Sequence, residues 1–178
     1  MYQRLLELKK KDSFVSIYYD SQERDKFLFG KIDAIDEFFV LLRAYNKIGM
    51  TDGLIMMPLD DIIRIEYGDP YSERMKKLIG NVTSVPSGVT EPVLLSMLDH
   101  CAVSGRVTAF ELDRSGADDV TGVIEAIGSD TVTVRQVDLY GADDGFTCFR
   151  IEDITFLKHD TDVLSALTKL RAMRADGE

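Results

Sequence analysis

The chain repeats itself. Aligned with itself at an offset of 92 positions, the sequence matches Phe14–Leu78 to Arg106–Leu170 without a gap. The identical pairs are Val15/Val107, Gly30/Gly122, Ile32/Ile124, Ala34/Ala126, Ile35/Ile127, Val40/Val132, Arg43/Arg135, Gly49/Gly141, Asp52/Asp144, Gly53/Gly145, Asp61/Asp153, Ile62/Ile154, Lys77/Lys169 and Leu78/Leu170. One offset held over so many positions indicates a duplicated structural unit. We therefore predict two copies of one fold.

Each copy begins and ends with a helical pattern and has five β-rich segments between the helices. In the first copy these segments are FVSIYY, KFLFGKIDAI, FFVLLRAY, LIMMPL and IIRIEY, which are rich in β-branched and aromatic residues. Asp69-Pro70 is typical of a helix start and Gly80 of a helix end, and Thr90 is the expected N-cap of the helix that opens the second copy. These signals predict a first domain at 1–80, a linker at 81–91 and a second domain at 92–178.

Gly30 and Gly122 occupy the same place inside the second β-rich segment of each copy. Glycine weakens a flat strand but permits a sharp bend. A long bent strand can close a small sheet into a barrel. The predicted fold class is therefore mainly β with flanking helices, as two five-stranded barrels in tandem.

Two acidic, glycine-containing stretches, GMTDG and GADDG, follow the third β-rich segment of each copy. Asp-Gly before an apolar run predicts a hairpin turn. A calcium loop would need oxygen ligands where the first copy has Ile48, Met50 and Leu59. An Asp before each fifth segment is expected to bond backbone amides in a tight turn. The predicted structural turn residues are Gly49, Asp52, Gly53, Asp61, Gly141, Asp144, Gly145 and Asp153.

The third β-rich segment predicts an unusual outer face in the first copy. Its counterpart TVTVRQV alternates cleanly between apolar and polar residues. The offset transfers this alternation to the first copy and places Phe39, Leu41 and Arg43 outward. The two large apolar side chains either lie under a helix or the second barrel, or they form an oligomer interface. Phe39 and Leu41 are thus the candidate interface residues.

The charge balance limits the partners that the chain can bind. The 178 residues contain 21 Lys and Arg against 31 Asp and Glu, a formal net charge of −10. This excess disfavours a partner bound mainly through phosphates, because such binding requires cations that release counterions. Residues 1–80 carry 13 bases and 14 acids, whereas the remaining 8 bases and 17 acids follow them. Any anion-binding role should therefore fall on the first copy.

No catalytic or metal-binding pattern stands out. Two cysteines, Cys101 and Cys148, are too few for a disulfide framework and make no zinc spacing with His100 and His159. We interpret both histidines as structural, and we expect no enzyme activity, cofactor or metal. The first residues lack a signal-peptide core, and no stretch approaches the ~20 apolar residues of a membrane span. These features favour a reduced, cytoplasmic protein that does not bind membranes.

The first copy resembles a known family. It is similar to the Sm-like (LSm) fold and to its Hfq-like members in the segments VSIYY, GKIDAIDEFFVLL and, after a loop, PLDDIIRIEY. The resemblance covers Leu5 to about Tyr67, and the repeat extends it to the second copy. It implies an SH3-like five-stranded barrel whose fourth and fifth strands are edges. Family members pair those edges into rings, so three chains could form a ring of six barrels, or the edges could pair within one chain.

The resemblance implies only some of the RNA-binding residues of the family in this chain. Hfq-like proteins bind uridine-rich RNA through an aromatic and a Gln near the third strand and a Lys-His pair before the fifth. Here the aromatic matches Phe38, but Glu37 takes the place of the Gln, and Leu59 and Asp60 take the place of the Lys-His pair. Stacking of an RNA base requires the aromatic ring, and binding of the RNA phosphates requires cations. Acids at these positions disfavour RNA.

We expect a non-catalytic Sm-like interaction or scaffold protein. It would self-associate through barrel edges or through the outer face at Phe39 and Leu41, and it could bind a protein partner. The alternative is RNA binding by the first barrel, for which the candidate contacts are Phe38, Arg43 and Lys47.

Overall fold

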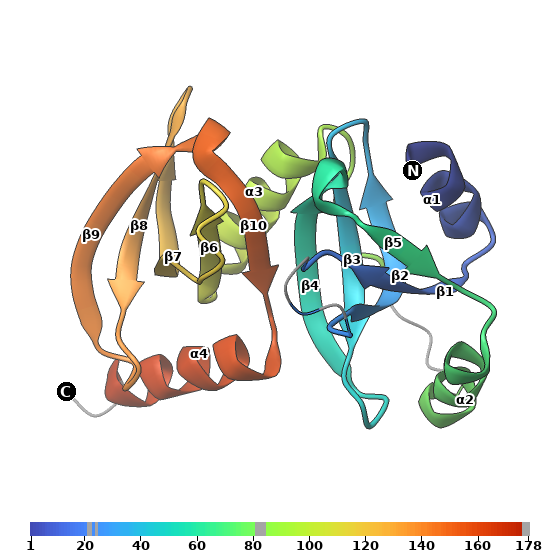
Figure 1. Cartoon of the computed structure of the whole chain (residues 1–178). Coiled ribbons are helices and arrows are strands. Elements are labelled where there is room, and N and C mark those ends of the chain that lie inside the picture. Colours follow the sequence, from blue (N-terminus) through green and yellow to red (C-terminus); the bar gives the residue numbers. More distant parts are fainter. Residues whose placement is uncertain (21–22, 24, 81–84, 176–178) are drawn as a thin grey trace. The chain divides into compact units, whose positions relative to one another are not determined.

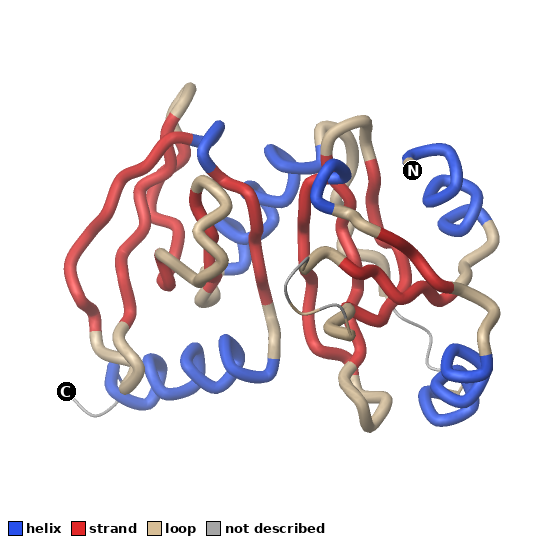
Figure 2. Tube along the Cα trace, in the orientation of Figure 1, coloured by secondary structure: helices blue, strands red, loops and turns tan. Residues whose placement is uncertain are grey.

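The protein is mainly β, with four α-helices among the residues described. The computed structural model describes residues 1–20, 23, 25–80 and 85–175. Its ten strands pair antiparallel, and the chain divides into two compact units, Met1–Ser96 (unit 1) and Met97–Glu178 (unit 2). Figures 1 and 2 show these elements along the chain. The predicted linker at 81–91 lies partly outside the described residues; residues 85–91 contain no helix or strand.

Unit 1 follows the predicted order of helix, five strands and helix. Its elements are α1 (Tyr2–Lys10), β1 (Phe14–Tyr18), β2 (Leu28–Ile35), β3 (Phe39–Tyr45), β4 (Thr51–Pro58), a 3-10 turn (Leu59–Asp61), β5 (Arg64–Glu66) and α2 (Pro70–Ile79). Within the unit the strands are hydrogen-bonded in the order β5-β1-β2-β3-β4.

Unit 2 has the same topology. The helix α3 (Val93–Ser104) begins before the boundary between the units and ends beyond it. The other elements are β6 (Thr108–Leu112), β7 (Val120–Ile127), β8 (Thr131–Val137), β9 (Asp143–Arg150), a 3-10 turn (Ile151–Asp153), β10 (Ile154–His159) and α4 (Asp162–Ala175). The strand order is β10-β6-β7-β8-β9, which repeats the order of unit 1 strand for strand.

The fourth and fifth strands stand at the two ends of the strand order in each unit. Among the described residues no ladder joins β4 to β5 or β9 to β10. Each unit is therefore an open antiparallel sheet, and its hydrogen bonding does not close into a barrel. Asp61 and Asp153 end the 3-10 turns that lead into these last strands.

Gly30 and Gly122 lie where the third strand of each unit passes too close for a side chain. A Cβ atom on Gly30 would collide with the backbone carbonyl oxygen of Arg43, and one on Gly122 would collide with that of Arg135. Each glycine thus lets the third strand of its unit approach the second more closely than any side chain would allow.

The predicted Asp-Gly hairpin turns are wrong in detail. Asp52-Gly53 and Asp144-Gly145 lie inside β4 and β9, where the register shifts and both glycines have positive φ, as in a β-bulge. The chain instead reverses one step earlier, at Asn46–Gly49 and Asp138–Gly141. The Asn46 side-chain oxygen accepts hydrogen bonds from Ile48 N–H and Met50 N–H at 3.1 Å each.

Asp138 forms the same turn in unit 2. Its carboxylate accepts from Tyr140 N–H and Ala142 N–H, both at 2.8 Å. The turn glycine packs on the closing helix in each unit, because a Cβ on Gly49 would meet Leu78 and one on Gly141 would meet Leu170. Gly49 and Gly141 thus lie within these turns, each against the closing helix of its unit.

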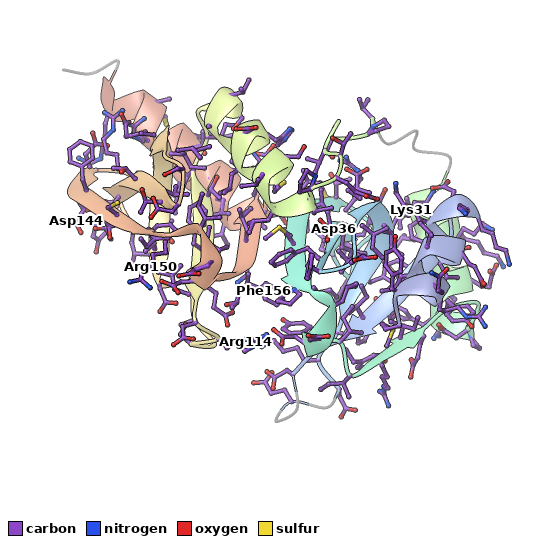
Figure 3. All side chains as sticks on the ribbon, turned by 90° about the horizontal axis from the view of Figure 1, so that it is seen from above. Lys31, Asp36, Arg114, Asp144, Arg150 and Phe156 are labelled. Atoms are coloured by element: carbon purple, nitrogen blue, oxygen red, sulfur yellow. The ribbon has the colours of Figure 1, made fainter. Side chains whose placement is uncertain are left out.

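The helix ends confirm two predictions and correct a third. The Asp69 carboxylate caps α2 by accepting from Tyr71 N–H and Ser72 N–H, and Gly80 ends the helix at φ 66°. Thr90 is not the cap of α3, which begins at Val93. The first free N–H group of α3 donates instead to Asp36, at the turn between β2 and β3 (Figure 3).

The closing helix of each unit covers a hydrophobic cluster built at matching positions. In unit 1 Tyr45 and Met75 belong to the cluster, and their counterparts Val137 and Leu167 belong to that of unit 2. On the predicted outer face Leu41 is fully buried, while Phe39 is partly exposed. This burial favours the alternative in which the pair is covered, and the interface at these residues stays a prediction.

Candidate functional sites

The three candidate RNA contacts do not gather into one site. Phe38 is 72% exposed and immediately precedes β3, Arg43 lies within β3, and Lys47 is exposed in the turn after it. Phe38 and Lys47 are nine residues apart, which in an extended chain corresponds to a separation of up to about 30 Å. An RNA strand could contact all three only by running along the whole of β3.

Arg43 is occupied by a structural ion pair. Its guanidinium lies 3.1 Å from the Asp33 carboxylate on β2, and both side chains are largely buried. The offset carries this pair into unit 2, where Arg135 donates to Glu125 from Nε at 2.7 Å. An ion pair at this position in both copies links the second strand to the third. Arg43 is therefore a poorer phosphate ligand than its position suggests.

A basic groove lies between the two helices of unit 1. It has a volume of about 850 Å³ and is bordered by the last turn of α1, by β2 and β3, and by the end of α2. Its charged lining residues are Lys9, Lys10, Asp12, Lys31, Asp33, Arg43 and Lys76. Five cations against two carboxylates make the groove positive, although the whole chain is strongly acidic.

Three of the five cations in the groove have no ion-pair partner among the described residues. Lys31 pairs with Asp12 and also lies 4.9 Å from the centre of the Phe14 ring. Lys9, Lys10 and Lys76 are exposed, and no ion pair reaches them from the described part of the chain. Sequence reasoning missed this groove because its lysines are spread over two helices and a strand.

Unit 2 contains a buried polar cluster around His159, whose side chain is fully inaccessible. Its Nδ1 lies 2.9 Å from Thr108 Oγ1, and its Nε2 lies 3.2 Å from Ser104 Oγ. Because Ser104 donates its own proton to the Cys101 carbonyl at 2.7 Å, it accepts from His159 Nε2–H. The neutral ring thus has both nitrogens satisfied.

Burial lowers the pKa of His159 to about 4, against the partial opposition of Asp160. Burial likewise raises the pKa of the neighbouring Cys101 thiol to about 12. Nucleophilic catalysis would require Ser104 to donate to the ring and a carboxylate to hold the opposite nitrogen. Here Ser104 accepts, and Asp160 lies 3.8 Å from the same Nε2. The arrangement is therefore structural, as expected for both histidines, although the contact of the His100 and His159 rings at 5.5 Å was not foreseen.

The end strand β9 is the most exposed of the described strands. Six of its eight residues are exposed, including Asp144, Phe146, Cys148 and Arg150, whereas β4, the matching strand, has one exposed residue. Figure 3 labels Asp144 and Arg150 toward the two ends of β9. In unit 1 the fifth strand β5 is likewise open, with Arg64 exposed and Ile63 beside it 55% exposed.

None of the four helices, as far as they are described, is long and apolar enough to cross a membrane. In the described ranges no group of three or more His, Cys, Asp or Glu side chains could hold a metal ion. Compared with family models, with curated proteins and with solved structures, the chain matches none.

Proposed function

We propose that the chain is a non-catalytic, cytoplasmic interaction protein of Sm-like architecture that associates with further copies of itself through exposed end strands. The observation that carries the proposal is β9, an eight-residue strand at the end of its unit's order with most of its residues exposed. Such a strand presents unpaired backbone groups to a partner strand.

The strand order supports the Sm-like part of the proposal. The fourth and fifth strands are the ends in both units, and a 3-10 turn links them. Glycine allows the second strand to bend closely against the third at Gly30 and Gly122. These are the features that the resemblance implies for a strongly bent, barrel-like unit.

The exposure pattern supports a second copy as the partner. The end strand β9 is mostly exposed and β5 is partly exposed, while β4 and β10 are mostly buried. One chain therefore offers a fourth-type strand and another offers a fifth-type strand, and antiparallel pairing of the two satisfies both edges.

Light scattering on the purified chain tests this proposal. We expect a mass above that of one chain, and we expect the double variant Phe146→Lys, Cys148→Lys to reduce it to a monomer, because like charges on an edge oppose strand pairing. Val103→Lys is the matched control, since Val103 is 90% exposed at the end of α3. A wild-type protein that stays monomeric at high concentration would refute self-association.

RNA binding by unit 1 is the alternative that the same preparation can test. The dispersal of Phe38, Arg43 and Lys47 along β3 and the pairing of Arg43 with Asp33 speak against it. Filter binding with uridine-rich and adenine-rich RNA at moderate salt distinguishes the two functions. Tight binding that Phe38→Ala abolishes would replace the interaction proposal with this one.

A further inference from the structure

We propose that the basic groove of unit 1 binds a small, multiply charged phosphate compound with an apolar portion. The groove is bordered by α1, β2, β3 and α2, and it includes Lys9, Lys10 and Lys76, for which the described part of the chain provides no ion-pair partner. This site is independent of strand pairing at β9 and β5, because none of its lining residues belongs to either strand.

The charge of the groove sets the charge of the ligand. Five cations and two carboxylates leave a net charge of +3, and the two carboxylates are already paired with Lys31 and Arg43. The three remaining ammonium groups thus match an anion of about three negative charges. Lysine ammonium groups are compact point charges that bind phosphate well.

The second copy shows that the fold does not require these lysines. Unit 2 has a groove of about 500 Å³ beside α4 that shares the equivalent positions Val123, Thr168, Arg171 and Ala172, and its other charged lining residues are Asp143 and Arg174. The positions that match Lys9, Lys10, Lys31 and Lys76 there are Cys101, Ala102, Val123 and Thr168.

A helix C-terminus favours cations in its last turn, so stabilisation of α1 and α2 could by itself account for lysines at these sites. The last turn of α3, however, contains no basic residue and still forms the same helix. The last turn of α4, the counterpart of α2, does contain a basic residue, Arg174, so the comparison identifies only Lys9 and Lys10 as surplus to helix formation, and a ligand accounts for these two.

The lining also has an apolar part. Leu6, Phe14, Ile32, Ile79 and Pro86 contribute to the same groove. The Phe14 ring stacks on Phe29 at 5.2 Å, so it is not free to intercalate between bases of a nucleic-acid strand. A volume of this size, with apolar walls and a few charges, suits a small molecule.

Isothermal titration calorimetry tests the proposal with three probes: inorganic pyrophosphate, adenosine diphosphate and citrate. We expect one site per chain, weakened by added salt. Adenosine diphosphate should bind more tightly than pyrophosphate because it adds an apolar portion, and citrate should bind more weakly than pyrophosphate. The triple variant Lys9→Gln, Lys10→Gln, Lys76→Gln should weaken phosphate binding by about tenfold or more, given the modest strength of each exposed pair.

The control is Lys47→Gln, Lys77→Gln, Lys169→Gln, which removes the same charge at exposed positions outside the groove. Thermal unfolding of both triple variants verifies that they fold. Absence of phosphate binding, or equal weakening by both triple variants, would overturn the site. Citrate binding as tightly as pyrophosphate would overturn the phosphate assignment, and adenosine diphosphate binding no more tightly than pyrophosphate would overturn the apolar portion.

Discussion

The carboxylate of Asp36 accepts a hydrogen bond from the backbone N–H of Val93 at 2.7 Å, across 57 residues of sequence. The same side chain accepts from Phe38 N–H and Phe39 N–H at the turn between β2 and β3. One largely buried carboxylate therefore fixes both a hairpin turn and the start of a helix. Unit 2 has Gly128 at the matching position, so this connection belongs to unit 1 alone.

Removing this carboxylate should destabilise the protein. We expect Asp36→Ala to lower the free energy of unfolding by about 1–3 kcal/mol, because it leaves buried N–H groups without an acceptor. Urea denaturation measures the loss, and amide exchange at Val93 should accelerate. Glu37→Ala is the neighbouring exposed control and should change little. If both variants are equally stable, Asp36 does not have this role.

The two strand glycines should resist substitution equally. Gly30→Ala and Gly122→Ala should each lower the free energy of unfolding by roughly 1–3 kcal/mol, since the new Cβ would collide with a backbone carbonyl that cannot move aside. Gly128→Ala is the control, because the nearest atom to its Cβ would be the Thr131 side-chain oxygen at 3.0 Å, with the Thr131 backbone oxygen at 3.5 Å in ordinary contact. Chemical denaturation compares the three, and a tolerated Gly30→Ala would contradict the proposed close approach.

Acid should weaken the fold through His159. Its pKa is lowered to about 4 in the folded protein, below the ordinary value of 6.5, so the unfolded chain binds the proton more readily. The stabilising contribution is complete above pH 6.5 and is lost as the pH falls toward 4, by up to about 3 kcal/mol.

The variant His159→Gln isolates this effect from the titration of the carboxylates. The stability difference between wild type and variant, measured by urea denaturation across this range, should shrink as the pH falls. His100→Gln, at the partly exposed ring that contacts His159, serves as the comparison. A difference that stays constant from pH 7 to pH 4.5 would show that His159 is not held neutral.

The two thiols should react very differently. Cys148 is exposed on β9, whereas Cys101 is fully buried and burial raises the pKa of its thiol to about 12. A maleimide reagent should label one thiol quickly in the native protein and the second only in denaturant. Mass spectrometry of the labelled peptides identifies the residue, with Cys148→Ser as the control. Fast native labelling of Cys101 would contradict its burial.

The repeat made the architecture predictable, because one offset relates every strand and the closing helices. The position of the turn was less accessible. Asn46 and Asp138 differ in identity, so they do not stand out as a repeated pair, and the neighbouring Asp-Gly signal favoured the wrong residues. Both side chains nevertheless form the same hydrogen bonds, because either oxygen can accept from the backbone two and four residues ahead.

The sites depended on contacts that no local pattern encodes. The lysines of the groove come from two helices and a strand, and only the packing of α1 and α2 brings them together. The cap that Asp36 provides for α3 depends in the same way on tertiary structure. Whether the outward-facing Leu41 is covered also depends on tertiary packing, and its side chain is fully buried.

Amide hydrogen exchange along β9, measured on dilute and on concentrated protein, tests the proposed association most directly. If β9 pairs with a strand of another copy, its amides between Asp143 and Arg150 should exchange more slowly at high concentration, while those of β8, which is paired on both sides, stay unchanged. The variant Phe146→Lys, Cys148→Lys should remove the concentration dependence. Exchange in β9 that is the same at both concentrations would contradict self-association through this strand.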